Sequence, residues 1–520
     1  MPGGFDYSRF DNIDVSDSED EAANTSGGKG APAVKADEVL AELPPDLPED
    51  LSLVLAAREG QSNLVEALLA KRVSANVTDP HGATALMKAV EGGVDNRPAI
   101  ELLLKNRAAV DTASKLGETP MNVAAAKGPA ILCEALLESG SPSKDVRGAA
   151  LVAAAVAGNE ATTGLLLGAQ APVCARGAGG RTALHCWAEK GNVSLLQKLL
   201  EARADANLRD ANGVSPLLSA ARSASKEAAQ CLCDHGAALN DVATDGCSPL
   251  VAAATLTDEA CALDVMSVLL GAGAKVEADS AVRGASSPLV AATSTGRKSI
   301  VEKLLDARAD PEAADGTGRR ALPCAAVAGK LDLCQLLLEG RAAVDARSTS
   351  GAAAVSSSAA AEGSGVTALS IAASTAKLRL VELLLGAGAD PEATDERGLK
   401  PLIAAAGKGS VDICKALLAA RAAVDAQEAE AGKSALLLAA GAGHAAVCGA
   451  LLGARADVQL PAVTGACPLH AAAANGHREV CEQLLAAGAD ASAPGPAGQD
   501  AVALAKSADH AALSDLLSAR

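Results

Sequence analysis

The stretch TGACPLHAAAANGHREVCEQLLAAGADASAPG, residues 464–495, predicts two short helices joined by a turn. Pro468 suits the first turn of a helix, where its missing N–H costs no hydrogen bond. The first helix is mostly Ala, so it can lie close to its neighbours. The second helix places Leu484 and Leu485 on an apolar face. Gly488 ends this helix because glycine adopts the left-handed conformation readily.

The same pattern recurs along the chain with a period close to 33 residues. A pair of leucines marks most of the second helices, and a glycine marks the turn before most of the first helices: Gly82, Gly117, Gly148, Gly180, Gly213, Gly246, Gly284, Gly318, Gly351, Gly398, Gly432, Gly465 and Gly498. About fourteen repeats therefore fill residues 46–520, and no length remains for another folded domain.

This pattern resembles the signature of the ankyrin repeat family, G-x-T-P-L-H-x-A-A-x-x-G-[HN]-x-x-[VI]-V-x-x-L-L-x-x-G-A. The matching residues in the quoted stretch are Pro468, Leu469, His470, Gly476, His477, Leu484, Leu485, Gly488 and Ala489. The resemblance implies an all-α solenoid of about 14 helix-turn-helix units with short β-hairpin loops. It also implies a long concave face, formed by the hairpin tips and the first helices.

An insertion divides the predicted array. After Gly351, the segment AAAVSSSAAAEGSG precedes the next first helix. We expect an N-terminal block over residues 46–347, an insertion over 348–365, and a C-terminal block over 366–520 that closes with an end cap. The insertion is either an extended hairpin or a hinge.

The composition argues against several classes of function. The net charge is −18, and no strongly basic region exists, so we expect no nucleic-acid partner. No apolar run reaches 18 residues, so we expect no membrane insertion. Walker, nucleophile-elbow and HExxH motifs are missing from the sequence. We therefore expect no enzyme, no catalytic residue, no cofactor and no metal site.

The histidines and cysteines favour structural roles. The family resemblance implies that the rings of His185 and His470 bond to neighbouring backbone. Five of the thirteen cysteines recur at one repeat position and predict small buried side chains: Cys133, Cys334, Cys414, Cys448 and Cys481. Free cysteines are typical of a reducing compartment, so we expect a protein of the cytoplasm or the nucleus. We also expect a monomer.

The only tryptophan, Trp187, replaces a small residue of the first helix in the fifth repeat. That position faces the interior between helices. The residue therefore either fills the core or stacks on a ligand. Core filling requires that the repeat backbone shifts or that the Ala-rich neighbouring repeats make room.

Residues 1–45 predict a disordered acidic tail, because they carry too few apolar side chains to offset the entropy of ordering. Residues 1–50 contain thirteen acidic and three basic residues, a net charge of −10. Three aromatic residues nevertheless lie within the first ten positions. Tyr7, Phe10 and Ile13 are typical of a short linear motif that folds onto a partner.

The segment FDYSRFDNIDVSDSEDE, residues 5–21, resembles the N-terminal segment of the kinase-directed co-chaperones of the ninety-kilodalton heat-shock chaperone. The match is to D-Y-S-x-[FW]-D-x-I-[DE]-V-S-D-x-E, a motif that carries a regulatory phosphoserine. The resemblance implies a chaperone or kinase partner. Ser16 and Ser18 each precede an acidic residue by three positions, as an acidophilic kinase prefers. The alternative is a tail that only improves solubility.

Arginine replaces the glycine that should end the second helix in seven repeats, whereas Gly140, Gly236, Gly273, Gly388 and Gly488 keep it. The seven are Arg72, Arg107, Arg203, Arg308, Arg341, Arg421 and Arg455. A left-handed Arg costs on the order of 1 kcal/mol relative to Gly. One interpretation pairs these side chains with carboxylates such as Asp205, Asp310 and Asp457. The other is a basic ladder for an acidic partner, including the phosphorylated tail.

These observations predict a scaffold or adaptor that binds partner proteins on the concave face of the array, regulated by phosphorylation of the tail. Two alternatives remain. One is a purely structural spacer, and the other is a recruiting subunit for a separate enzyme such as a kinase or a chaperone.

Overall fold

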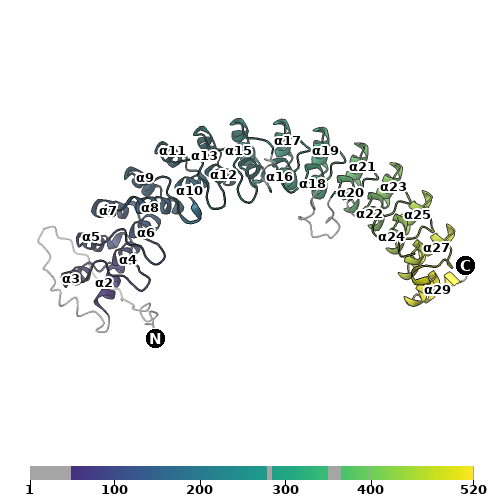
Figure 1. Ribbon diagram of the computed structural model, residues 1–520, viewed down its shortest axis with the longest axis horizontal. Coiled ribbons are helices and arrows are strands. Elements are labelled where there is room, and N and C mark those ends of the chain that lie inside the picture. The colour runs from purple at the N-terminus through teal and green to yellow at the C-terminus, as the bar shows by residue number, and fades with distance from the viewer. Residues whose placement is uncertain (1–47, 278–283, 349–364, 396–397, 519–520) are drawn as a thin grey trace, which may run out of the picture.

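The computed structural model describes residues 48–277, 284–348, 365–395 and 398–518. Within these ranges the chain forms 28 α-helices in fourteen consecutive pairs and contains no strand. The pairs stack into an arc with the first and the last helices far apart (Figure 1). The first helix of each pair lies on the inner side of the arc, and the second lies on the outer side (Figure 1). The predicted all-α solenoid of about 14 units is confirmed.

The inner helices are mostly seven or eight residues long, and many begin with Pro. They are α2 Glu49–Arg58, α4 Ala85–Glu91, α6 Pro120–Lys127, α8 Lys144–Ala157, α10 Ala183–Lys190, α12 Pro216–Arg222, α14 Pro249–Thr255, α16 Pro288–Thr295, α18 Ala321–Ala328, α20 Ala368–Ser374, α22 Pro401–Gly407, α24 Ala435–Gly441, α26 Pro468–Ala474 and α28 Ala501–Ser507.

The outer helices are mostly nine residues long. They are α3 Ser62–Ala70, α5 Arg97–Lys105, α7 Ala130–Gly140, α9 Glu160–Gly168, α11 Val193–Glu201, α13 Lys226–Asp234, α15 Glu259–Gly271, α17 Lys298–Asp306, α19 Leu331–Glu339, α21 Leu378–Gly386, α23 Val411–Ala419, α25 Ala445–Gly453, α27 Arg478–Ala486 and α29 Ala511–Ser518. Short 3-10 turns lie at Val94–Asn96, Ala178–Gly180 and Pro496–Gly498.

The core runs along the whole array between the two helix layers. Ala405 and Ala439 of neighbouring inner helices are fully buried, and so is Leu417 of the outer layer. The five cysteines at one repeat position are also fully buried, as predicted. Burial raises the pKa of the Cys334 thiol to about 12, so it stays protonated and acts as a small apolar side chain.

Most outer helices connect to the next inner helix through a segment that we call the hairpin loop. Within the described residues these loops contain three isolated bridges: Thr78–Thr84, Ser348–Val366 and Gln427–Ser434. Successive loop tips bond through their backbones, as where Ala211 N–H donates to Gly179 O at 2.8 Å and Thr244 N–H donates to Asn212 O at 2.9 Å. The loops therefore form a connected row.

A second set of contacts joins the bases of successive hairpin loops. A side-chain oxygen of one repeat accepts a hydrogen bond of 2.7–2.8 Å from a backbone N–H of the next. The pairs are Asn76–Ala109, Asn207–Ala238, Asn240–Lys275, Glu277–Asp310, Glu312–Ala343, Glu392–Ala423 and Asp425–Asp457.

The fourth repeat departs from the predicted pattern. The sequence predicts Gly148 in a turn, but it lies inside α8, and only three residues separate α7 from α8, with no hairpin loop between them. The side chain of Ser143 accepts from Val146 N–H and starts the helix early. A Cβ on Gly148 would lie 2.7 Å from that of Ala175, so close packing explains this glycine. The predicted helix-ending role of Gly140 is also wrong, because Ser141 takes the left-handed position, with φ 45°.

The predicted insertion falls almost wholly outside the described residues, which resume at residue 365. Its two ends lie together: Ser348 N–H donates to Val366 O at 3.3 Å, and Gly365 N–H donates to Ser348 O at 2.7 Å. Helices α18 and α20 pack directly on each other. The division into an N-terminal and a C-terminal block stays a prediction.

In the C-terminal repeats, the turn between the inner and the outer helix requires a glycine for two reasons. Gly443 has a φ of +76°, and its ideal Cβ would lie 2.6 Å from Nδ1 of His477 in the next repeat. His477 Nε2 lies 3.1 Å from Gly441 O, which it bonds as a donor. The turn therefore needs both a left-handed residue and an absent side chain.

We expect Gly443→Ala to cost more stability than Gly236→Ala. Gly236 has nearly the same φ, +77°, but nothing lies within 4 Å of its ideal Cβ. Both variants lose about 1 kcal/mol to backbone strain, and Gly443→Ala loses a further ~1–3 kcal/mol because His477 must move. Hydrogen exchange of the helices that flank each site measures the difference. Equal loss of protection in the two variants would exclude the proposed role of His477.

Candidate functional site

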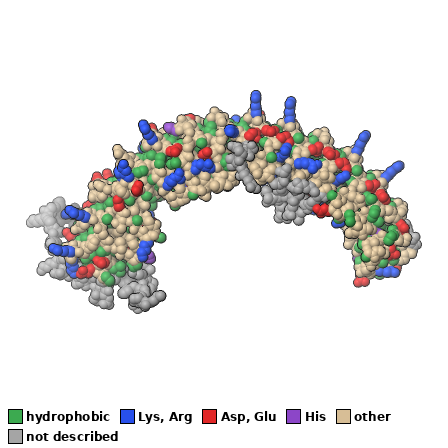
Figure 2. All heavy atoms as spheres, in the orientation of Figure 1, with side chains coloured by type: hydrophobic (Ala, Val, Ile, Leu, Met, Phe, Trp, Pro, Cys, Tyr) green, Lys and Arg blue, Asp and Glu red, His purple; other side chains and the backbone are tan. Residues whose placement is uncertain are grey.

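The candidate surface for recognition is the inner side of the arc, where the inner helices and the hairpin loops lie (Figure 1). Figure 2 shows acidic and basic side chains intermixed over the central part of the array, and basic side chains that project from the convex edge. A surface of this kind is suited to binding a protein rather than an apolar small molecule.

A polar groove of about 320 Å³ lies where α10 and α12 meet the hairpin loop between α11 and α12. Its lining residues are Arg181, Glu189, Asp210, Asn212, Val214, Ser219, Arg222 and Ser223. Both signs of charge and the two hydroxyl groups of Ser219 and Ser223 therefore line one opening. The mixture can bind a polar peptide segment, because it offers hydrogen-bond donors and acceptors side by side.

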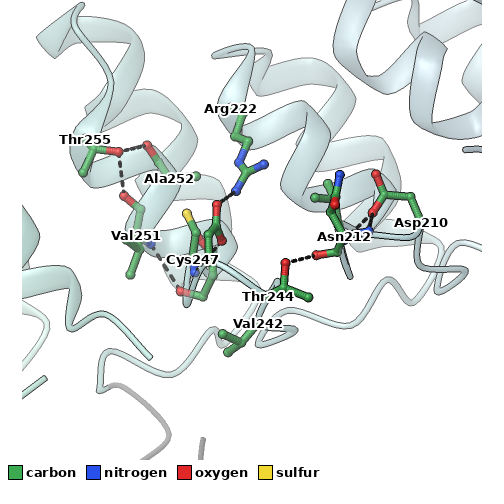
Figure 3. A network of polar contacts seen from close by, with 12 residues as sticks. Asp210, Asn212, Arg222, Val242, Thr244, Cys247, Val251, Ala252 and Thr255 are labelled. Atoms are coloured by element: carbon green, nitrogen blue, oxygen red, sulfur yellow. Dashed lines mark hydrogen bonds and ion pairs between the residues drawn. The ribbon is translucent and has the colours of Figure 1, made fainter. Parts of the chain in front are cut away.

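Ion pairs hold the two guanidiniums of the groove. Arg222 Nη2 lies 2.5 Å from Asp245 Oδ2 on the next hairpin loop (Figure 3), with side chains 39% and 57% exposed. Arg181 pairs with Glu189 in the same way. Asp210 Oδ1 accepts from the backbone N–H groups of Asn212 and Val214, each at 2.8 Å, so its other oxygen can accept from a ligand.

Arginine side chains also link the loops around the groove. Arg176 Nη1 donates to the carbonyl oxygen of Arg209 at 2.8 Å, and Arg209 in turn donates to the carbonyl oxygens of Gly213 and Val242. Thr244 Oγ1 donates to Asn212 O at 3.0 Å (Figure 3). The loops are thus fixed before a partner arrives, which lowers the entropic cost of binding.

His185 is fully buried and bonds to Val214, one of the residues that line the groove. Its Nδ1 accepts from Thr182 N–H at 3.1 Å, and its Nε2 lies 3.0 Å from Val214 O on the following loop. This arrangement requires the neutral tautomer with the proton on Nε2. Burial lowers the pKa of His185 below 6.5, and the favourable effects of Val214 O and Asp210 offset this only in part. The predicted bonding of His185 and His470 to neighbouring backbone is confirmed.

The stability of the fifth and sixth repeats should fall as the pH drops below about 6.5. The unfolded chain takes up a proton on His185 near pH 6.5, whereas the folded chain does so only at lower pH, so acid favours unfolding. Urea unfolding followed by the fluorescence of Trp187, two residues away, measures the change between about pH 7.5 and 5.5.

The matched variants are His185→Gln and His470→Gln, at the same position of two repeats. We expect the first to flatten the pH dependence of the Trp187 transition and the second to leave it unchanged. A wild-type midpoint that stays constant over this range would contradict the role given to His185.

Trp187 fills the core rather than facing a ligand. Its side chain is 1% exposed, and its indole N–H has no partner among the described residues. Of the two interpretations of this residue, the structure supports core filling, and the ligand-stacking interpretation is wrong.

The seven arginines that replace glycine all adopt the predicted left-handed conformation. Their φ angles run from 61° to 69°: Arg72, Arg107, Arg203, Arg308, Arg341, Arg421 and Arg455. All seven are exposed at the C-terminal ends of outer helices. No hydrogen bond or ion pair joins any of these guanidiniums to another residue that the structure describes.

The carboxylates expected to pair with these arginines bond elsewhere. Asp205, Asp310 and Asp457 each use Oδ1 to accept a hydrogen bond of 2.9 Å from the backbone N–H two residues further along. They stabilise their own turns, as Asp does in such turns. The interpretation that pairs the arginines with these carboxylates is therefore wrong.

The predicted linear motif lies outside the described residues. Tyr7, Phe10, Ile13, Ser16 and Ser18 all belong to residues 1–47. Their proposed contacts and phosphorylation stay predictions.

Sequence reasoning did not single out the polar groove. Its signal was present in α12, because Arg222 ends this inner helix and, among the described inner helices, only α2 also ends with Arg. Asp245 lies on the next loop, 23 residues away. Only the stacking of repeats brings the two together.

Comparison with known families identifies the repeat. The family model for ankyrin repeats (three copies) matches residues 53–147, 184–280, 350–428, 369–462 and 423–495. The matches cover more than half of the chain, which therefore belongs to the ankyrin repeat family. A comparison with curated protein sequences found no match. Ankyrin repeats form protein–protein interaction modules that are generally not enzymes.

No group of three or more His, Cys, Asp or Glu side chains in the described part of the chain could hold a metal ion. Among the helices of those same residues, none has the length and apolar character needed to cross a membrane.

Proposed function

We propose that this ankyrin repeat protein is a scaffold or adaptor that binds partner proteins on its concave face. The carrying observation is the polar groove at α10 and α12, whose loops are held in place by Arg176 and Arg209. A purely structural spacer has no need of such a prearranged set of exposed charges. The cytoplasm or the nucleus is the proposed compartment.

The groove defines what a partner segment must supply. A carboxylate of the partner can bond to Arg181 or Arg222, whose side chains are 35% and 39% exposed. A donor on the partner can bond to Asp210. We expect a polar, extended segment that carries at least one acidic side chain.

Charge reversal in the groove should remove partners. Arg181→Glu with Arg222→Glu places new carboxylates beside Glu189 and Asp245, so an acidic partner segment is repelled. We expect partner recovery in quantitative affinity capture to fall by more than about tenfold, which corresponds to about 1.4 kcal/mol.

The matched control is Arg379→Glu on outer helix α21, where the side chain is 85% exposed. This variant should keep every partner. If the groove variant also keeps its full set of partners, the groove is not the binding site, and the spacer interpretation gains support.

A second element of the proposal is the N-terminal segment. We propose that residues 5–21 dock a chaperone or a kinase, with Tyr7, Phe10 and Ile13 in contact, and that phosphorylation of Ser16 and Ser18 regulates this docking. Two phosphates add about three to four negative charges. In this arrangement the protein can also act as the recruiting subunit of a separate enzyme.

Removal of residues 1–45 should separate the two kinds of partner. We expect the shortened chain to lose a chaperone or kinase and to keep the partners of the concave face. Affinity capture of both forms, each with and without treatment by an acidophilic kinase, measures this. Identical partner sets for the two forms would show that the tail only improves solubility.

A further inference from the structure

Four cations gather at the outer end of the first two repeats. Lys71 and Arg72 follow α3, and Lys105 and Arg107 lie at the end of α5, which packs against α3. All four residues are exposed. We call these four residues the basic cluster. Arg72 and Arg107 have no bonding partner among the described residues.

The nearby carboxylates neutralise only part of the basic cluster. Glu101 of α5 pairs with Arg97, one turn earlier in the same helix, at 2.8 Å. Glu49 pairs with Lys71 at 3.5 Å. The negative ends of α3 and α5 offset part of the positive charge, about half a charge for each helix. A net positive surface therefore remains at this end of the array.

The same chain carries an acidic segment ahead of the first repeat. The contact between Glu49 and Lys71 places the start of the array next to Arg72. Residues 11–21, DNIDVSDSEDE, contain six carboxylates and no basic residue. The 27 residues from 22 to 48 span on the order of 30 Å as a flexible linker and roughly 90 Å when extended. The tether can therefore reach a neighbouring repeat.

We propose that the acidic segment, residues 11–21, docks on the basic cluster of the same molecule. The short tether gives the segment a millimolar effective concentration at the cluster. Arginine suits this role because its planar guanidinium binds carboxylate or phosphate with two parallel hydrogen bonds. Phosphorylation of Ser16 and Ser18 tightens the contact. The proposal is independent of which partner binds the concave face.

The charges of Arg72 and Arg107 can be removed without a change of the backbone. Glycine occupies the same left-handed position in other repeats, for example at Gly236 and Gly388. Arg72→Gly with Arg107→Gly therefore leaves the backbone free to keep its conformation. The control is Arg421→Gly with Arg455→Gly, which makes the same change in two adjacent repeats far from the tether.

Zero-length carbodiimide coupling of the full chain, read by mass spectrometry, tests the proposal. We expect cross-links from carboxylates of residues 11–21 to Lys71 and Lys105. Their yield should fall at least threefold in the Arg72→Gly, Arg107→Gly variant, and also in about 1 M salt, where the screening length is about 3 Å. It should rise after treatment with an acidophilic kinase and stay constant in the control variant. The pair Lys400 and Glu392, 2.6 Å apart, calibrates the yield.

Three outcomes would overturn the proposal. The first is an unchanged yield in the Arg72→Gly, Arg107→Gly variant, because the cross-links would then report only the tether. The second is an even spread of cross-links to distant lysines such as Lys408 and Lys415. The third is a set of cross-links formed only between two chains, seen with a mixture of isotope-labelled and unlabelled protein.

Discussion

A side-chain oxygen at the base of most hairpin loops accepts a hydrogen bond from the next repeat, and the continuity of the array depends on this contact. The bond is short, 2.7–2.8 Å, at seven junctions. The described part of the array has no strand ladder to satisfy the backbone of its loops, so side chains satisfy part of it. Each bond contributes only about 0.5–1.5 kcal/mol. Because each repeat touches only its neighbours, such small terms set the stability of every junction.

The fourth repeat lacks a hairpin loop before its first helix, although Asp111 Oδ2 still accepts a hydrogen bond from Ser143 N–H at 3.0 Å. With no hairpin loop before α8, the helix is fourteen residues long and packs along α6. Arg147 of α8 reaches the end of α9, where its Nη1 donates to Ala169 O at 2.5 Å. This guanidinium stabilises the negative end of α9, and its hydrogen bond replaces part of the bonding that a hairpin loop would supply. The row of loops is nevertheless interrupted here, so the concave face is not uniform along the arc.

Much of the fold could be predicted because the pattern repeats. The spacing of Gly and Leu defines the helix pairs, and glycine at the same position of other repeats, such as Gly236 and Gly388, predicts the left-handed conformation of the seven arginines. The helical position of Gly148 could not be predicted, because a glycine on the 33-residue spacing is equally compatible with a turn or with a close helix contact. The polar groove could not be predicted either. Arg222 and Asp245 meet only through the rotation between neighbouring repeats, which no local pattern encodes.

The arginines show why fold and recognition can vary separately in this protein. A left-handed residue other than Gly costs about 1 kcal/mol or more, and a cation at a helix C-terminus returns about 0.3–1 kcal/mol. The two effects offset each other in large part, so the free energy of unfolding depends little on whether Arg or Gly occupies the position. The side chain there projects into solvent and touches nothing that holds the repeats together. Charge at the ends of the outer helices is therefore free to be set by what the array must bind, while the Ala and Leu core remains the same.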